Sequence, residues 1–372
     1  MKRICLVANS TLFLYKYHSM IRDLLSNGLE VILIAPMDRY VSHFSATPRL
    51  HHIHLQHLDA SGKNPFRDFL LYREIKGHFK KLRPDLVFSF TIKPNIYCTR
   101  AARELGLTCI PSITGLGYTF THGGFLETLV TQMYRHSLRS SRNIIFRNRE
   151  DLKHFQELGI THSSQNLLVQ GVGIDLQHFQ TVYSKAPVFT FLFVGRILSD
   201  KGVREFVSAS RILKNQGMRV KCALLGPLDA QNPSVIPPQE LAGWLAEGVV
   251  EYYGKTDDVR PYLAQCDVFV LPSYREGLST AILEALAMER PVITTDAPGC
   301  KDAIDENCGW TVPVKNTKAL ARAMKIAYEM PQQKLQAMGE AGRSRVQRRF
   351  TKANMNKMYL DLALTHKEAV HS

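Results

Sequence analysis

Two carboxylates eight residues apart, Glu276 and Glu284, lie where a buried strand is predicted to end and a helix to begin. The run 267–273 is typical of a short buried strand, and Ser279 or Thr280 can cap the helix that follows. Glu284 would lie about one turn inside that helix, since each residue adds about 1.5 Å. One acid could then bind a sugar and the other a ribose, with a diphosphate at the positive helix N-terminus between them. The spacing by itself also fits two solvated charges on an amphipathic helix.

A second group of residues has the chemistry of a phosphate site. Gly195, Arg196, Lys201 and Gly202 follow a strand-like run at 189–194. Glycine lets the backbone approach a ligand, arginine offers a planar fork, and lysine offers a compact point charge. Together these groups could neutralise the charge that builds on a departing nucleoside diphosphate. The alternative for the isolated octapeptide is a surface loop with ordinary basic residues.

Length and composition predict a globular protein of two domains. The chain has 372 residues, of which 45% are hydrophobic and 22% charged. No apolar run approaches the roughly 20 residues that cross a bilayer, and residues 1–8 resemble a strand rather than a signal peptide, so secretion is not expected. The seven cysteines are scattered without Cys-x-x-Cys spacing, which predicts reduced thiols in the cytoplasm and neither a zinc site nor disulfides.

The net charge of +14 is concentrated in the first half of the chain. Residues 1–170 hold 22 Lys and Arg against 12 Asp and Glu, which gives +10, and the remainder holds 25 against 21, which gives +4. A nucleic acid, an anionic membrane and a phosphorylated substrate would all suit this charge. Charge alone does not choose among them.

The order of apolar runs predicts an α/β fold with two doubly wound, Rossmann-like domains. Strand-like runs alternate with helical patterns at 4–8, 31–35, 86–90 and 144–146, and a second series runs through 189–195, 222–226, 249–253, 268–271 and 292–294. Helical periodicity lapses around 171–187, which predicts a linker. We therefore expect an N-terminal domain at 1–172, a second domain at 173–345 and a C-terminal helix at 346–372. A helical, basic stretch is also expected from about residue 340 to residue 365.

Several segments together resemble retaining glycosyltransferase family 4. The segment around Glu276 and Glu284 resembles the Glu-x7-Glu motif of that family, and the Gly195–Gly202 segment resembles its Gly-Arg…Lys-Gly element. The segments 91–95 and 114–117 resemble the Thr-x-Lys-Pro-Asn and Thr-Gly-Leu-Gly elements of family members that act on undecaprenyl-diphosphate-linked sugars. The loop 296–302 resembles a family loop near the donor, although a plain strand-to-helix turn fits it almost equally well.

The resemblance implies two Rossmann-like domains facing a central cleft, the GT-B fold, with a C-terminal helix crossing back to the first domain. It implies transfer of a hexose or N-acetylhexosamine from a nucleotide sugar, with UDP the expected nucleotide, to a polyprenyl-diphosphate-linked sugar in glycan or surface polysaccharide assembly. The second domain would bind the donor and the first the acceptor. No metal and no cofactor are expected, because the chain has no Asp-x-Asp and the helix dipole with Arg196 and Lys201 could replace a divalent cation.

The residues carried over from the family fall into three groups. The catalytic group is Arg196, Lys201, Glu276 and Lys93. The donor-binding group is Asn9, Gly195, Arg196, Lys201, Gly254, Lys255, Glu276, Gly277, Leu278, Ser279, Thr280 and Glu284. The acceptor-binding group is Thr91, Lys93, Asn95, Thr114, Gly115, Gly117 and His122.

Two segments depart from the family pattern. Asn9 stands where many relatives have a glycine-rich loop, and the missing glycines also exclude a dinucleotide fingerprint after the first strand. No histidine lies between Phe90 and Asn95, where some relatives place a catalytic one, so Lys93 is the substitute to test. His122 is close in sequence, but a lone histidine in a loop is more often structural.

Two basic amphipathic stretches, at 66–81 and 125–141, could lie on an anionic membrane, or their apolar residues could simply pack on the sheet. The expected location is cytoplasmic, peripheral on the inner face of the cytoplasmic membrane. Two alternative functions remain: a sugar-nucleotide epimerase of the same architecture, and a basic nucleic-acid-binding protein. The second lacks a recognisable RNA-binding module, so no nucleic acid partner is expected.

Overall fold

The computed structural model describes residues 1–44, 47–60, 62, 64–116, 124–169, 173–181, 187–230 and 232–365, without the side chains of Phe125 and Leu126. Two compact units divide the chain. Unit 1 holds the chain from Met1 to Val172 and again from Lys352 onward, and unit 2 holds Gly173–Thr351. Each unit is built on its own parallel sheet, as the restart of apolar runs at residue 189 predicted.

Unit 1 contains a seven-stranded parallel sheet, counted over the described residues, in the order β3-β2-β1-β4-β5-β6-β7. Its strands are β1 (Arg3–Val7), β2 (Glu30–Ala35), β3 (Leu50–His54), β4 (Leu86–Phe90), β5 (Cys109–Ile113), β6 (Ile144–Phe146) and β7 (Asn166–Leu168). Its helices are α1 (Thr11–Tyr15), α2 (His18–Ser26), α3 (Pro65–Leu82), α4 (Ile92–Glu104), α6 (Phe125–Leu138), α7 (Arg149–Glu157) and α14 (Lys352–Thr365), with 3-10 turns η1 (Arg39–Phe44) and η2 (Ser163–Gln165).

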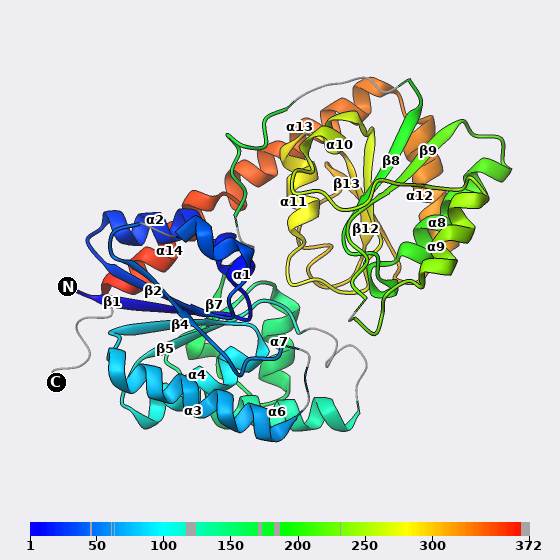
Figure 1. Cartoon of the computed structure of the whole chain (residues 1–372). Coiled ribbons are helices and arrows are strands. Elements are labelled where there is room, and N and C mark those ends of the chain that lie inside the picture. The colour runs from blue at the N-terminus through cyan, green and yellow to red at the C-terminus, as the bar shows by residue number, and fades with distance from the viewer. Residues whose placement is uncertain are drawn as a thin grey trace. The chain divides into compact units, whose positions relative to one another are not determined.

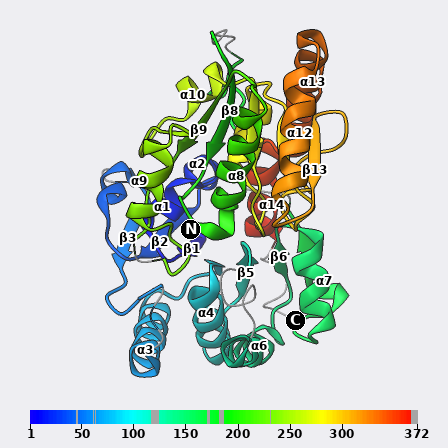
Figure 2. The same cartoon turned by 90° about the vertical axis from the view of Figure 1, so that its right-hand side faces the viewer.

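The alternation of side chains along β1 gives unit 1 a core on each face of its sheet. Cys5 and Val7 face one core, which α3, α4 and α6 cover, whereas Ile4 and Leu6 face the other. Figure 1 shows α2 and α14 along the second face, and Figure 2 shows α3, α4 and α6 side by side beneath the sheet.

The C-terminal helix α14 returns to unit 1, as the resemblance predicted. Met355, Tyr359 and Ala363 recur on one face of α14 and are buried in the same core as α2. The Tyr359 ring lies edge-on to Phe88 with 5.1 Å between ring centroids. This contact pattern explains why the last helix belongs to unit 1 although α13 (Gln332–Arg349), directly before it, belongs to unit 2.

Unit 2 contains a six-stranded parallel sheet, again over the described residues, in the order β10-β9-β8-β11-β12-β13. Its strands are β8 (Phe189–Val194), β9 (Val220–Leu225), β10 (Glu251–Tyr252), β11 (Val268–Leu271), β12 (Val292–Thr295) and β13 (Gly309–Val312). Besides α13, its helices are α8 (Val203–Asn215), α9 (Pro238–Ala246), α10 (Arg260–Gln265), α11 (Thr280–Ala287) and α12 (Thr317–Glu329), with the 3-10 turn η3 (Ser199–Lys201).

Candidate functional site

Each sheet reverses its strand order at one point, and the candidate residues gather there. In unit 2 the reversal lies between β8 and β11, and in unit 1 it lies between β1 and β4. Open parallel sheets bind ligands outside the carboxyl ends of their strands at this switch point. The segment 195–202 follows β8 and the segment 272–279 follows β11, so the two donor-side motifs predicted from the sequence are neighbours in unit 2.

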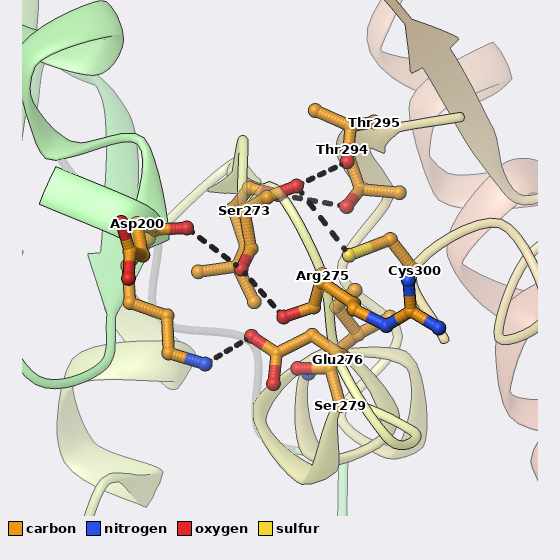
Figure 3. Close-up of polar contacts among 11 residues, drawn as sticks. Asp200, Ser273, Arg275, Glu276, Ser279, Thr294, Thr295 and Cys300 are labelled. Atoms are coloured by element: carbon orange, nitrogen blue, oxygen red, sulfur yellow. Dashed lines mark hydrogen bonds and ion pairs between the residues drawn. The ribbon is translucent and has the colours of Figure 1, made fainter. Parts of the chain in front are cut away.

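The two motifs meet in an ion pair. Lys201 Nζ lies 2.5 Å from Glu276 Oε1, and the two side chains are only 18% and 15% exposed (Figure 3). The pair therefore has little water around it, which strengthens its electrostatic attraction relative to a fully exposed pair. Both residues were predicted from the sequence as donor-site residues, but their ion pair was not predicted.

Backbone contacts fix this approach. The backbone N–H of Tyr274 donates to the carbonyl of Asp200 at 2.9 Å, and the Ser273 hydroxyl donates to the same carbonyl at 3.3 Å (Figure 3). Gly202 has φ +73°, and a Cβ there would lie 2.1 Å from the carbonyl oxygen of Pro272. Only glycine allows both the conformation and the contact, so this glycine of the motif is explained by packing within the protein.

The loop 296–302 supports Glu276 from the other side. Glu276 N–H donates to the carbonyl of Pro298 at 3.0 Å, and Ser279 N–H donates to that of Gly299 at 3.3 Å. Gly299 has φ +72°, and a Cβ there would lie 2.2 Å from the carbonyl oxygen of Glu276. This loop is thus more than a plain strand-to-helix turn, because it holds the backbone of the acidic motif in place.

A buried layer of polar groups lies under the acidic motif. The Ser273 carbonyl accepts hydrogen bonds from the Thr295 hydroxyl at 2.5 Å and from the Cys300 thiol at 3.8 Å (Figure 3). Burial raises the pKa of the Cys300 thiol to about 12, and the negative charge of Glu276 acts in the same direction. All seven cysteines are buried and free, in agreement with the reduced thiols predicted from their spacing.

Helix α11 begins where the sequence predicted, and of the two candidate caps, Ser279 and Thr280, it is Ser279 that forms the N-cap. The Ser279 hydroxyl accepts a hydrogen bond from the N–H of Ile282 at 3.4 Å. The N–H groups of Thr280 and Ala281 donate to no acceptor within the described residues, and they are the groups that an anion at this helix end would meet. Glu284 is half-buried on the fifth residue of the helix, counted from Thr280.

Arg196 does not join the Lys201–Glu276 pair. Its guanidinium binds Asp229 Oδ2 at 2.9 Å and is half exposed. Gly195, beside it, is in close contact with Gly226, since a Cβ on Gly226 would lie 1.8 Å from the Gly195 carbonyl oxygen. The predicted two-cation clamp is therefore present in this structure as one cation paired with Glu276 and one paired with Asp229.

The other predicted donor residues lie on turns of unit 2. The Gly254 carbonyl accepts a hydrogen bond from Gly226 N–H at 2.8 Å, which ties the 254–255 turn to the end of β9, and Lys255 is exposed. Gly277 and Leu278 are half-buried between Glu276 and the start of α11. The 254–255 turn follows β10 and the acidic motif follows β11, so both lie at the carboxyl ends of strands of the same sheet.

In unit 1, the switch point carries Asn9 after β1 and Thr91 after β4. Asn9 was predicted on the donor side and lies in unit 1. Thr91 has φ +71° and ψ 165°, a region that is almost confined to glycine, and its Oγ1 is buried with no hydrogen-bond partner among the described residues. Such strain in a β-branched residue is typical of functional positions, and the sequence gives no sign of it.

Lys93 and Asn95 are both engaged inside unit 1. Lys93 Nζ donates to Asp68 Oδ1 and to the Gly62 carbonyl, each at 2.7 Å. Asn95 is fully buried, accepts from the Ser89 hydroxyl at 2.9 Å and donates to the Ser112 carbonyl at 2.9 Å. In this structure Asn95 therefore holds α4 to β4 and β5, which is a structural role rather than the acceptor contact that we predicted.

The remaining acceptor-side residues follow β5. Thr114 and Gly115 are half-buried at its carboxyl end, next to the switch point strands. Gly117 and His122 lie outside the described residues. Asp229, which binds Arg196, had no sequence signal, whereas Asp200 and the loop 296–302 lie in segments that the sequence analysis had identified.

Neither a metal-binding cluster nor a membrane-spanning helix is found among the described residues. No group of three or more His, Cys, Asp or Glu side chains there is arranged to hold a metal ion. No helix in the same part of the chain has the length and apolar character needed to cross a membrane.

Comparison with known proteins agrees with this arrangement. Residues 3–148 match the family model "Glycosyl transferase 4-like", and residues 188–329 match "Glycosyl transferases group 1". The chain is 28% identical, over 81% of its length and 82% of the relative, to the N,N'-diacetylbacillosaminyl-diphospho-undecaprenol alpha-1,3-N-acetylgalactosaminyltransferase of Campylobacter jejuni. It is 29% identical, over 77% and 79%, to the capsular polysaccharide biosynthesis glycosyltransferase CapM of Staphylococcus aureus.

The fold also matches a solved structure. The crystal structure of Anabaena Alr3699/HepE in complex with UDP-glucose superposes with a TM-score of 0.76 at 15% identity, over 97% of this chain and 99% of that one. The two sheets, their strand orders and the returning C-terminal helix are those of the GT-B fold. The chain belongs to the family 4 glycosyltransferases.

Proposed function

We propose that the protein transfers a hexose or N-acetylhexosamine from a nucleotide sugar, with UDP as the nucleotide, to a polyprenyl-diphosphate-linked sugar, in the assembly of a surface polysaccharide or glycan. The observation that carries this proposal is the Lys201–Glu276 pair at the switch point of unit 2, next to the N-terminus of α11. A donor's diphosphate and sugar would there meet a cation, a helix end and a carboxylate. The Campylobacter relative is an N-acetylgalactosaminyltransferase named for a diphospho-undecaprenol-linked sugar, and this supports the acceptor class.

The donor would replace contacts that the protein now makes with itself. Glu276 would release Lys201 and accept hydrogen bonds from the sugar, while Lys201 would turn to the diphosphate. Glu284 would accept hydrogen bonds from the ribose. Arg196 would leave Asp229, which is a small loss because the pair is half exposed and such pairs contribute about 0–1 kcal/mol.

We propose retention at the anomeric carbon by a same-face substitution. The leaving diphosphate oxygen would take the proton of the acceptor hydroxyl as the new glycosidic bond forms and the bond to the diphosphate breaks. Lys201, Arg196 and the N–H groups of Thr280 and Ala281 would stabilise the negative charge on the departing diphosphate, a role that needs no metal and no cofactor. No carboxylate is assigned here as a covalent nucleophile.

On the acceptor side, we propose that the switch point of unit 1 binds the lipid-linked sugar. Thr91 offers a hydroxyl with no partner among the described residues, and Thr114 and Gly115 lie one strand away. Lys93 uses two of its three N–H donors on Asp68 and Gly62, which leaves one for an acceptor.

We also propose that unit 1 lies on the inner face of the cytoplasmic membrane through α3. The apolar residues Leu71, Ile75 and Phe79 of this helix are buried in the core, so they pack on the sheet. Phe66 and Phe69, however, are 67% and 53% exposed. Exposed Arg67, Arg73, Lys80 and Lys81 on the same helix would attract acidic lipids.

One experiment tests the transfer reaction. A panel of nucleotide sugars is first screened for protection against heat unfolding. The protective donor is then incubated with a short-chain polyprenyl-diphosphate sugar, with and without chelator, and the anomeric configuration of the product is read by NMR. We expect an extended acceptor with the donor's configuration in both conditions. An inverted linkage, or activity that chelator removes and magnesium restores, would contradict the mechanism.

A control without acceptor separates the alternative function. A sugar-nucleotide epimerase would release an epimer or a free sugar from donor alone, whereas a transferase would leave the donor largely intact.

Sedimentation with phosphatidylglycerol vesicles at low and high salt tests the membrane proposal. The variant is Phe66→Ser/Phe69→Ser, and the control is Leu245→Ser, which replaces an exposed apolar residue of unit 2. Equal binding of both variants would refute the role of α3.

A further inference from the structure

A cavity lies at the amino ends of two strands of the unit 1 sheet. This cavity, of about 400 Å³, is lined by the end of α4, the start of β5 and the segment between α6 and β6. These are the amino ends of the strands, whereas the candidate acceptor residues follow their carboxyl ends. Figure 2 shows α4 and α6 next to each other beneath the sheet. The cavity therefore has no part in the site described above.

The charged residues of this cavity are arginines. Arg103 and Arg142 line it. Arg103 donates to the carbonyl of His136 at 2.8 Å and contacts its Nε2 at 2.9 Å, so neither bond neutralises its charge. Arg142 is exposed, and within the described residues no carboxylate pairs with either arginine.

Glu104, the acidic residue next to Arg103 in the sequence, is already engaged. Glu104 accepts hydrogen bonds from Lys76 at 2.6 Å, from the Tyr72 hydroxyl, and from Arg100 at 3.2 Å. The bond from Lys76 is the main reason why the pKa of Glu104 is lowered to about 2. Its negative charge is thus balanced by other residues, and the cavity keeps a net positive field.

The positive charges near the cavity act on the side chain of His136. Loss of hydration lowers the pKa of this imidazole, and the positive charges of Arg103, Arg139 and Arg100 lower it further. Three arginine charges therefore act on one point near the cavity. A neutral His136 can accept the hydrogen bond from Arg103, which orients that guanidinium.

A buried hydroxyl adds a polar group without a partner. Ser141 lines the cavity and is only 5% exposed, and its Oγ has no hydrogen-bond partner among the described residues. The Ser141 carbonyl accepts a hydrogen bond from Gln165 Nε2 at 2.7 Å, which holds this segment in place. A buried hydroxyl without a hydrogen-bond partner is unfavourable unless a ligand or a water molecule forms a hydrogen bond with it.

We propose that this cavity binds a phosphate group through Arg103, Arg142 and Ser141. Two arginine forks and a hydroxyl donor match the oxygens of a phosphate, which arginine binds through paired N–H groups. A soluble phosphate compound and a phospholipid headgroup share this chemistry. This phosphate site is independent of the transfer reaction, because it contains neither Lys201 nor the residues that directly follow β4.

Heat unfolding in inorganic phosphate tests the site, with chloride added to match ionic strength. About 20 mM phosphate should raise the Tm of the wild-type chain by about 2 °C or more. Arg142→Gln should lose this rise, because Arg142 is exposed and its replacement should leave folding intact. Arg103→Gln should lose it as well, while Arg322→Gln, an exposed arginine of α12 in unit 2, should keep it.

The outcomes separate the proposal from its alternatives. No rise in the wild-type chain, or an equal rise in Arg142→Gln, would overturn the site. A rise that is lost in Lys201→Met instead would locate the phosphate at the candidate donor site and overturn it too. If Arg142→Gln also loses binding to phosphatidylglycerol vesicles relative to phosphatidylcholine vesicles, the ligand is a lipid headgroup, and unchanged vesicle binding assigns a soluble phosphate compound.

Discussion

Lys201 and Glu276 neutralise each other across the switch point of unit 2, with 2.5 Å between Nζ and Oε1. A ligand that needs the lysine must therefore compete with the glutamate. The pair also explains how two opposite charges are accommodated at less than one-fifth exposure, since each satisfies the other.

Glu276→Gln should bind UDP more tightly than the wild-type chain while transferring sugar more slowly. UDP has a diphosphate but no hexose, so it gains from a freed Lys201 and loses nothing from the missing carboxylate. We expect a threefold to tenfold lower Kd, or about 0.7–1.4 kcal/mol. Calorimetric titration measures it, with Lys201→Met as the control that should weaken UDP binding. Weaker binding in Glu276→Gln would mean that the pair instead holds Lys201 in its binding position.

Gly299→Ala should disturb the acidic motif directly. The new Cβ would lie 2.2 Å from the Glu276 carbonyl oxygen, and φ +72° is itself unfavourable for alanine. We expect the free energy of unfolding to fall by about 2–4 kcal/mol, with loss of donor binding. Gly217→Ala is the matched control, because Gly217 has φ +78° and nothing within 4 Å of its added Cβ. Gly217→Ala should lower the free energy of unfolding by only about 1–2 kcal/mol and keep donor binding. Equal losses in the two variants would show that the positive φ, and not the contact with Glu276, causes the destabilisation.

Most central strands could be predicted from the sequence, whereas of the four edge strands only β10 lies in a predicted run, 249–253. The run 268–271 is apolar throughout, and 86–90 is interrupted only by the buried Ser89, because both faces of a central parallel strand are buried. Strand β3 contains His51, His52 and His54 and is only half-buried, so its residues resemble a loop. Strand β7 forms the other edge of the unit 1 sheet, and β13 forms the edge of the unit 2 sheet opposite β10. Both strands are short and give equally weak patterns.

The candidate site was predictable in its motifs and not in its contacts. Ser279, one of the two predicted N-cap candidates, marks the junction of strand and helix, and capping could be predicted because it is a local property. The pairing of Arg196 with Asp229 joins loops 33 residues apart in sequence and depends on the fold. The basic stretch at 340–365 was expected as one helical segment, but it breaks at Phe350, where the backbone N–H of Ile174 binds the Phe350 carbonyl at 2.7 Å.

Glu284→Ala should weaken donor binding. If Glu284 accepts hydrogen bonds from the ribose, the variant loses charge-assisted bonds worth roughly 1.5–3 kcal/mol, which corresponds to a rise in donor Kd of about tenfold to hundredfold. Glu247→Ala, an exposed glutamate after α9, controls for the loss of one negative charge. Unchanged nucleotide affinity in Glu284→Ala would refute the ribose contact.

Lys93→Met and Asp68→Asn separate a catalytic or acceptor-binding lysine from a structural one. Both variants break the same ion pair, whose side chains are only 15% and 21% exposed, so both should lower stability by a similar amount, about 1–3 kcal/mol. Only Lys93→Met removes the ammonium group. We expect a raised acceptor KM in Lys93→Met and near-normal kinetics in Asp68→Asn, measured with the lipid-linked acceptor. Equal kinetic loss in both would mean that Lys93 acts only by holding α3 to α4.

Thr91→Gly should raise stability and lower activity. Glycine adopts φ +71° and ψ 165° without the strain of about 1–3 kcal/mol that a β-branched residue carries there, although its unfolded chain is more flexible by about 0.5–1 kcal/mol. The expected net gain is about 1 kcal/mol in the free energy of unfolding, measured by urea titration. The lost hydroxyl should raise the acceptor KM, whereas Thr91→Ser keeps the hydroxyl and should retain most of the activity. A variant that is less stable than the wild-type chain would show that Thr91 is not strained in solution.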